Sequence, residues 1–149
     1  MDFKIPEPLK AEHEELHAEL VKAMKIPGKT GEAARTVATF LRQHLIHEEE
    51  YALPPLGLLP ALAGDKVTPE MRQVLALTDK LKAELRQMLA EHQAIGGALQ
   101  KLIAAAQAEG KPEVEQFAKK LILHMRTEEE IVYPTSILIG EYVRTRLGK

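Results

Sequence analysis

Hydrophobic positions along most of the chain recur at the spacing of an amphipathic helix. Such a pattern covers residues 9–25, 32–53 and 69–109, with apolar side chains three or four residues apart. Two further segments, residues 112–133 and 135–146, continue it. No segment shows the strict alternation that is typical of a half-buried β-strand. The pattern therefore predicts an all-α protein with a short C-terminal helix.

Proline and glycine separate these helices. Residues 26–31 form a cluster of helix breakers, and residues 56–66 are predicted to connect the second helix to the third. Gly110 is a candidate C-terminal cap, and Pro134 is expected to end or kink the fourth helix. Short connections between long amphipathic helices favour an antiparallel four-helix bundle. We expect a single domain over residues 1–149.

Composition and charge exclude several classes of protein. Cysteine is absent, which excludes disulfides, thiolate metal sites, iron–sulfur clusters and cysteine nucleophiles. The net charge of -2 provides no basic field for a nucleic acid or an anionic membrane, so we expect neither as a partner. Residues 1–6 lack the apolar core of a secretory signal, which leads us to expect a cytoplasmic protein.

An internal repeat carries the candidate chemistry. Aligning His44 with His124 superimposes a leucine, the histidine, three consecutive glutamates and a closing proline. The segments around His13 and His92 match less closely. Each repeat is thus a helix pair, with one histidine on its first helix and a His-x-x-x-Glu motif on its second. The repeats cover about residues 9–54 and 88–134.

The repeated residues are suited to binding metal. Residues four apart share a helix face, so each His-x-x-x-Glu motif directs a nitrogen and a carboxylate at a common centre. Imidazole with carboxylate suits iron, manganese or zinc, and two matched sets favour two ions that the carboxylates could bridge. The predicted ligands are His13, His44, Glu48, His92, His124 and Glu128.

Other interpretations of these residues account for less. A histidine on a helix face is usually an ordinary core or surface residue, and a run of glutamates is usually a solvated face. Four of the six histidines nevertheless fall at matched positions. Motifs of zinc proteases and of ferritin-like carboxylate proteins are absent. The glutamates expected to face solvent are Glu49, Glu50, Glu129 and Glu130.

These motifs together resemble the hemerythrin-like, His-His-Glu cation-binding domains, from about Leu9 to Pro134. The resemblance implies an antiparallel four-helix bundle with a centre of two non-haem iron ions (Fe²⁺/Fe³⁺), zinc or manganese being alternatives. It also implies that the two histidines of each repeat bind one iron and that Glu48 and Glu128 bridge both. The implied pairs are His13 with His44 and His92 with His124.

The sequence departs from the oxygen-carrying members at one ligand. They have a second histidine four residues before the position of His92, where this chain has Met88. His17, four residues after His13, could instead provide a fifth nitrogen. We expect His47 to lie beside the ligands or on the surface rather than among them.

The leading functional hypothesis is a di-iron protein that binds O2 or NO reversibly, as sensor, carrier or scavenger. The alternative is a di-iron oxidoreductase that reduces peroxide or NO, or an iron-centre repair enzyme; a metal-buffering or structural bundle is a third. Because a thioether is a poor ligand for iron, we expect the open position to face Met88, with Gly96 and Gly97 providing room. The sequence is also compatible with a homodimer.

Overall fold

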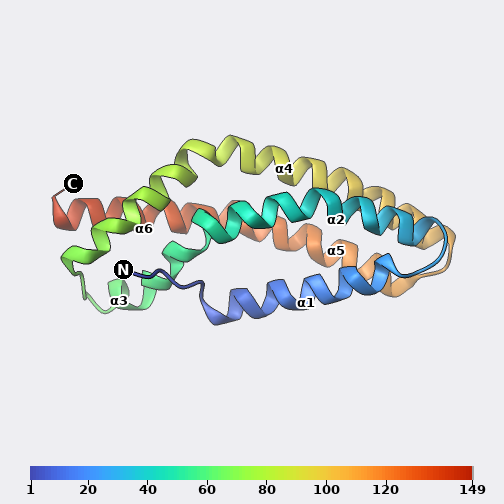
Figure 1. Cartoon of the computed structure of the whole chain (residues 1–149), viewed down its shortest axis with the longest axis horizontal. Helices are drawn as coiled ribbons and strands as arrows, with labels where there is room; N and C mark the ends of the chain where they lie inside the picture. Colours follow the sequence, from blue (N-terminus) through green and yellow to red (C-terminus); the bar gives the residue numbers. More distant parts are fainter. Residues whose placement is uncertain (149) are drawn as a thin grey trace.

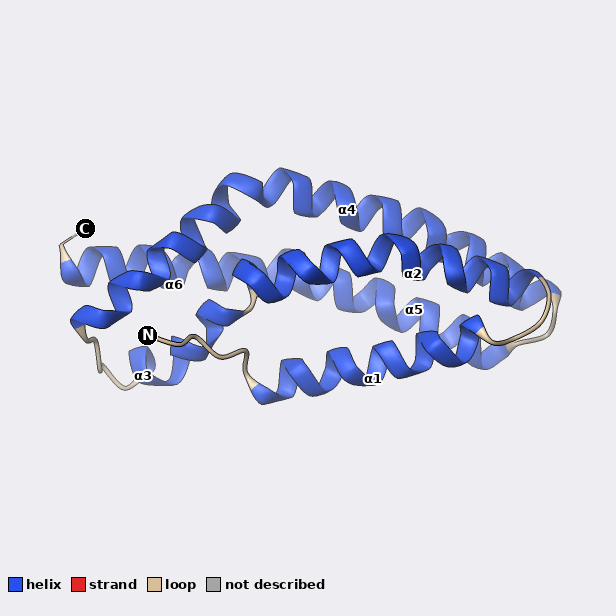
Figure 2. Cartoon of the chain, in the orientation of Figure 1, coloured by secondary structure: helices blue, strands red, loops and turns tan. Residues whose placement is uncertain are grey.

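The apolar helix faces pack against one another in an antiparallel four-helix bundle (Figure 1). The computed structural model describes residues 1–148, and every regular element in that range is helical (Figure 2). The long helices are α1 (Glu7–Met24), α2 (Lys29–His47), α4 (Val74–Ala108), α5 (Pro112–Thr127) and α6 (Tyr133–Leu147). Helix α1 contacts α2 and α5, and α4 also contacts both α2 and α5, so the four helices close a ring.

A π-helical turn lies at the same place in both repeats. One, Glu48–Ala52, follows α2, and the other, Glu128–Val132, joins α5 to α6. Pro134 therefore does not end the helical path, which was one of the two outcomes expected for it. It lies in the first turn of α6, where the π turn has already interrupted the regular hydrogen-bond ladder. After the first π turn the chain continues through a 3₁₀ segment, Pro54–Leu58, and the short helix α3 (Leu59–Ala63).

Both short interhelical loops lie at the same end of the bundle (Figure 1). There the Glu109 carboxylate accepts hydrogen bonds from the backbone N–H groups of Lys29 and Thr30, at 3.1 and 2.9 Å. This tertiary cap satisfies the first donors of α2 and begins the helix three residues before the expected Glu32. Gly28, with φ of 90°, makes the sharp turn that precedes it.

Helix α4 has 35 residues and is somewhat shorter than the predicted helix over residues 69–109. A 3₁₀ turn, Pro69–Gln73, precedes it, and the helix continues without a break through Gly96 and Gly97. A Cβ atom added at either glycine would meet nothing within 4 Å. The pair therefore does not break the helix, and no other helix in the described part of the chain packs closely against it.

The candidate ligands lie between two apolar clusters. The main cluster fills the four-helix part of the bundle, and a small cluster lies beyond the ligands on the side of α6. The small cluster consists of Tyr51, Ala52, Leu81, Met88 and Tyr133. Within residues 1–148, none of the helices has the length and hydropathy needed to cross a membrane.

Candidate metal centre

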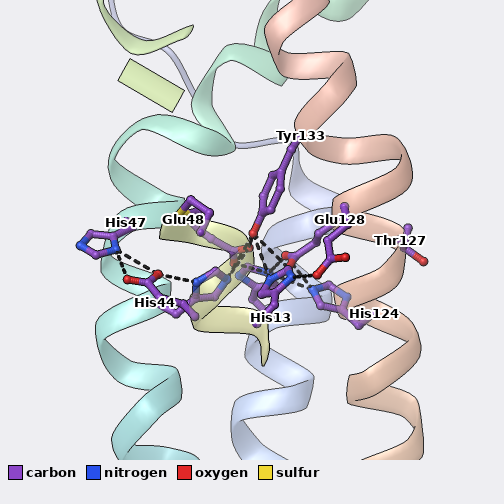
Figure 3. Close-up of polar contacts among 12 residues, drawn as sticks. His13, His44, His47, Glu48, His124, Thr127, Glu128 and Tyr133 are labelled. Atoms are coloured by element: carbon purple, nitrogen blue, oxygen red, sulfur yellow. Dashed lines mark hydrogen bonds and ion pairs between the residues drawn. The ribbon is translucent and has the colours of Figure 1, made fainter. Parts of the chain in front are cut away.

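Four helices bring the repeated histidines and glutamates into one layer of the bundle (Figure 3). The histidines come from α1, α2, α4 and α5, and each is three residues from a buried side chain of the main cluster. Packing of these neighbours sets the rotation of each helix, so that each imidazole turns inward. The neighbours are Leu16, Leu41, Ile95 and Leu121.

Four side chains form what we term the inner group: His44, Glu48, His92 and Glu128. Nε2 of His44 lies 3.2 Å from Oε2 of Glu48, and Nε2 of His92 lies 3.1 Å from Oε1 of Glu128. The two imidazole rings are 4.4 Å apart between centroids. No member is more than 3% exposed, so the inner group is shielded from bulk water.

Three side chains form what we term the outer group: His13, His124 and Glu128. Oε2 of Glu128 lies 3.0 Å from Nε2 of His124 and 3.4 Å from Nε2 of His13. The two nitrogens are 3.3 Å apart. Both histidine side chains are 11% exposed, which places the outer group nearer to solvent than the inner group.

The two glutamates divide their oxygens between the groups. In Glu128, Oε1 faces the inner group and Oε2 faces the outer group. In Glu48, Oε2 faces His44 while Oε1 lies 3.6 Å from Nε2 of His13. Each carboxylate is therefore placed to bridge two metal ions.

The grouping of the histidines differs from the one that the resemblance implied. The structure groups His44 with His92 and His13 with His124, so each group combines the two repeats. Every helix of the ring contacts both of its neighbours, so the grouping follows from the distances between these side chains and not from the order of the helices. The implied pairing of histidines within one repeat therefore differs from this grouping of side chains and stays a prediction about the bound metal.

Three histidines are also held from the outside by a carboxylate. A carboxylate that accepts a hydrogen bond from Nδ1–H fixes the ring and leaves Nε2 facing the centre. The expectation that Glu129 only faces solvent was wrong, because Nδ1 of His92 on α4 lies within hydrogen-bond distance of the Glu129 carboxylate. The bonds to Nδ1 are Glu91 to His44 at 2.8 Å, Glu129 to His92 at 2.6 Å and Glu12 to His124 at 2.8 Å.

The remaining histidines lie outside both groups. His47, partly exposed, has its Nδ1 3.0 Å from Glu91, beside the ligands as expected. His17 is exposed and lines surface pockets next to His13. The structure thus brings six of the predicted ligands together and leaves His17, the candidate fifth nitrogen, at the rim.

Tyr133 is a member of the site that the sequence pattern did not reveal (Figure 3). Its hydroxyl donates a short hydrogen bond to Glu48, and its oxygen lies 3.2 Å from Nε2 of both His44 and His92. In a regular helix, residue 133 would point about 140° away from Glu128. The π turn, in which the Tyr133 N–H bonds to the Glu128 carbonyl, brings both side chains to one face.

The carboxylates of the centre stabilise positive charge on the neighbouring histidines and so raise their pKa values. Burial alone would lower the pKa of His44, but its hydrogen bonds to Glu48 and Glu91 outweigh burial and raise the pKa to about 9. The pKa values of His13 and His124 are raised for the same reason, with Glu128 as the main partner. Protonated imidazoles thus provide the charge that a bound cation would replace.

A small cavity opens onto the centre from the side of α1. It has a volume of about 20 Å³, and apolar side chains make up most of its wall. Met88, where the open position was expected, does not line this cavity; it is fully buried and its sulfur accepts a hydrogen bond from Tyr51. The apolar wall consists of Leu16, Leu41, Leu45, Leu121 and Met125.

The donor set fits metal ions in spacing as well as in chemistry. Bonds of about 2.0–2.2 Å from one ion to nitrogen and oxygen put neighbouring donor atoms about 3 Å apart. Neighbouring donor atoms in the two groups lie 3.0–3.4 Å apart, and all donor atoms of a group lie within 4.8 Å of one another. A four-helix bundle with inward-facing histidines and bridging glutamates defines a class of helical metal-binding proteins.

Comparison with known proteins identifies the family. Residues 7–136 match the hemerythrin HHE cation-binding domain, and the chain belongs to this family. No curated protein and no solved structure matches the chain significantly. The family match and the His/Glu cluster agree that this is a cation-binding domain with residues able to hold a metal.

Proposed function

We propose that this chain is a non-haem di-iron protein that takes up O2 or NO reversibly, as a sensor, carrier or scavenger. The observation that carries the proposal is a pair of donor groups that share Glu128, with a cavity lined by members of both groups. Imidazole and carboxylate are donors that suit iron. Iron bound there would supply a redox-active ion with positions that the protein leaves free.

The shape of the cavity supports a diatomic ligand. A volume of about 20 Å³ is close to that needed by one water-sized molecule. Four leucines and Met125 line one part of the cavity, and their side chains offer no hydrogen bonds to a larger polar substrate. Its polar end is formed by histidines and glutamates of the centre, so a small ligand that enters meets the donor groups directly.

A second candidate function is an oxidoreductase that consumes peroxide or NO, or an iron-centre repair enzyme. The position of His17 outside both groups favours this second function, because the two groups then contain four imidazoles and not five. A centre with fewer protein donors leaves more positions for a reacting ligand. Steady consumption of peroxide or NO by the iron-loaded protein would support this function over reversible uptake.

The test is elemental analysis combined with the optical spectrum of the aerobic protein, with and without azide. We expect about two iron ions per chain, one for each donor group. Azide should change the visible spectrum at equal iron content, and washing should reverse the change. Iron well below one per chain, or a spectrum that azide leaves unchanged, would contradict the proposal. Zinc or manganese in place of iron would assign the same donors to another metal.

A further inference from the structure

The Tyr133 hydroxyl lies in the centre of the inner group, and a hydrogen bond to Glu48 alone would not require this position. Its side chain is fully buried, and it reaches the centre from above in Figure 3. Its oxygen lies 3.2 Å from the Nε2 atoms of His44 and His92 and 3.4 Å from Oε1 of Glu128. A hydroxyl that served only to orient Glu48 would need that one contact.

The spacing of the Tyr133 oxygen matches that of a ligand. The donors of one metal ion lie about 3 Å from one another. The phenol oxygen stands at this spacing from an atom of each inner-group residue, so one ion among them would also be within bonding reach of the phenol oxygen. Phenol oxygen is a hard donor, of the kind that ferric iron accepts in proteins.

We propose that Tyr133 is a metal ligand of the inner group, bound through its phenol oxygen. This inference rests on the proposed function, since it requires a metal in that group. Coordination replaces the hydroxyl proton, which is released. The inner group then has five protein ligands, which are His44, Glu48, His92, Glu128 and Tyr133. The outer group has His13, His124 and the shared Glu128, and is left as the place where a small ligand binds.

The repeat shows that this ligand belongs to one half only. The residue that corresponds to Tyr133 is Leu53, which follows the first π turn and makes the equivalent backbone bond to Glu48. Leu53 is buried in an apolar cluster with Leu56 and Val74. The same backbone geometry thus presents an oxygen to the inner group in one repeat and a hydrocarbon to the core in the other.

The test is the visible spectrum of the iron-loaded, air-oxidised full chain. A phenolate bound to ferric iron gives a charge-transfer band, which Tyr133→Phe should abolish at equal iron content. Tyr51→Phe is the matched control, because Tyr51 is also buried but its hydroxyl bonds to the Met88 sulfur. The control should keep the band. An identical spectrum in Tyr133→Phe and the wild type would overturn the inference.

A second measurement covers the case in which Tyr133→Phe does not fold or load iron. The chain has three tyrosines, so Tyr51→Phe combined with Tyr142→Phe leaves Tyr133 alone. Resonance Raman excitation of this double variant should enhance tyrosine ring vibrations that shift with ring-deuterated tyrosine. If the double variant binds iron but lacks these vibrations, the Tyr133 inference alone is overturned. If the unmodified chain binds no iron either, the proposed function fails together with the inference. If the tyrosine vibrations are present but azide leaves the visible spectrum unchanged, only the proposed uptake of O2 or NO is contradicted.

Discussion

The inner and outer groups use matched residues in different surroundings. The inner histidines are almost fully buried, and a carboxylate holds Nδ1 of each. In the outer group, His124 has such a carboxylate, whereas within residues 1–148 none lies on Nδ1 of His13. His13 also belongs to α1, which borders the cavity. The repeat thus supplies two similar donor sets, and packing makes one rigid and the other accessible.

Two substitutions between the repeats produce much of this difference. Tyr133 reaches the inner group, whereas its counterpart Leu53 packs into the core. Glu129 bonds to His92, whereas its counterpart Glu49 is exposed and lines a surface pocket with His13 and His17. A symmetric set of ligands therefore becomes a centre with one closed side and one open side. We expect variants of the two sides to differ in size of effect.

The largest expected effect is loss of metal when a shared ligand is removed. Glu128 belongs to both groups, so Glu128→Ala should remove both ions, whereas Glu48→Ala should empty the inner group and only weaken the outer one, from which Glu48 is farther. Glu49→Ala, the exposed neighbour, is the control and should keep both. Elemental analysis of folded protein checks the order. Equal losses in all three variants would contradict the assignment of the inward-facing glutamates.

A large effect is also expected on stability at alkaline pH after chelation of metal. The pKa of His44 is raised to about 9 in the fold, above the ordinary 6.5. A raised pKa adds stability below pH 6.5 that is lost as the pH rises through 9. The difference corresponds to roughly 3 kcal/mol of unfolding free energy. Urea titrations in chelator between pH 6 and 9.5 should show this fall, and His44→Gln should flatten it.

The metal-loaded protein should show the opposite dependence. Ligand histidines must be neutral to bind metal, so acid releases the metal and several protons compete together. The two stability curves should therefore converge as the pH falls. A chelated protein that gained stability from pH 6.5 to 9 would show that the buried carboxylates do not hold protons on the imidazoles.

Most of the fold could be predicted from the sequence. Helix periodicity with proline and glycine punctuation locates the four bundle helices to within a few residues, because both signals are local. The start of α2 could not be located, because Glu109 caps it from a distant part of the chain. The uninterrupted path past Pro134 depends on a π turn, which a search at the 3.6-residue period does not detect.

The candidate site could be predicted only in part. The repeat identified the six residues that the structure gathers, because residues four apart share a face. It could not identify Tyr133, which the π turn rotates inward, or the grouping of the histidines, which depends on the positions of their side chains in the folded bundle. Leu53 and Tyr133 occupy matched positions, and the change from a leucine to a tyrosine there is a sequence signal that the two repeats differ.

A smaller effect is expected from the carboxylates that hold the histidines from outside. Glu129→Gln weakens the acceptor for Nδ1 of His92 without removing a metal ligand, so inner-group affinity should fall about tenfold. Glu49→Gln is the matched control, since Glu49 is the corresponding residue in the other repeat and is exposed. The rate of metal transfer to a chelator measures both. Similar rates in the two variants would show that Glu129 does not support the inner group.

The smallest effect should come from narrowing the cavity. Leu45 is partly buried in its wall, so Leu45→Phe should fill part of the space of about 20 Å³ and slow azide binding several-fold. Met88→Leu is the control on the other side of the centre, where the cavity does not extend. Stopped-flow measurement of the azide-induced absorbance change compares them at equal iron content. A slower reaction in Met88→Leu with no change in Leu45→Phe would move the entry route to the inner group, and the outer group would then not be the open side.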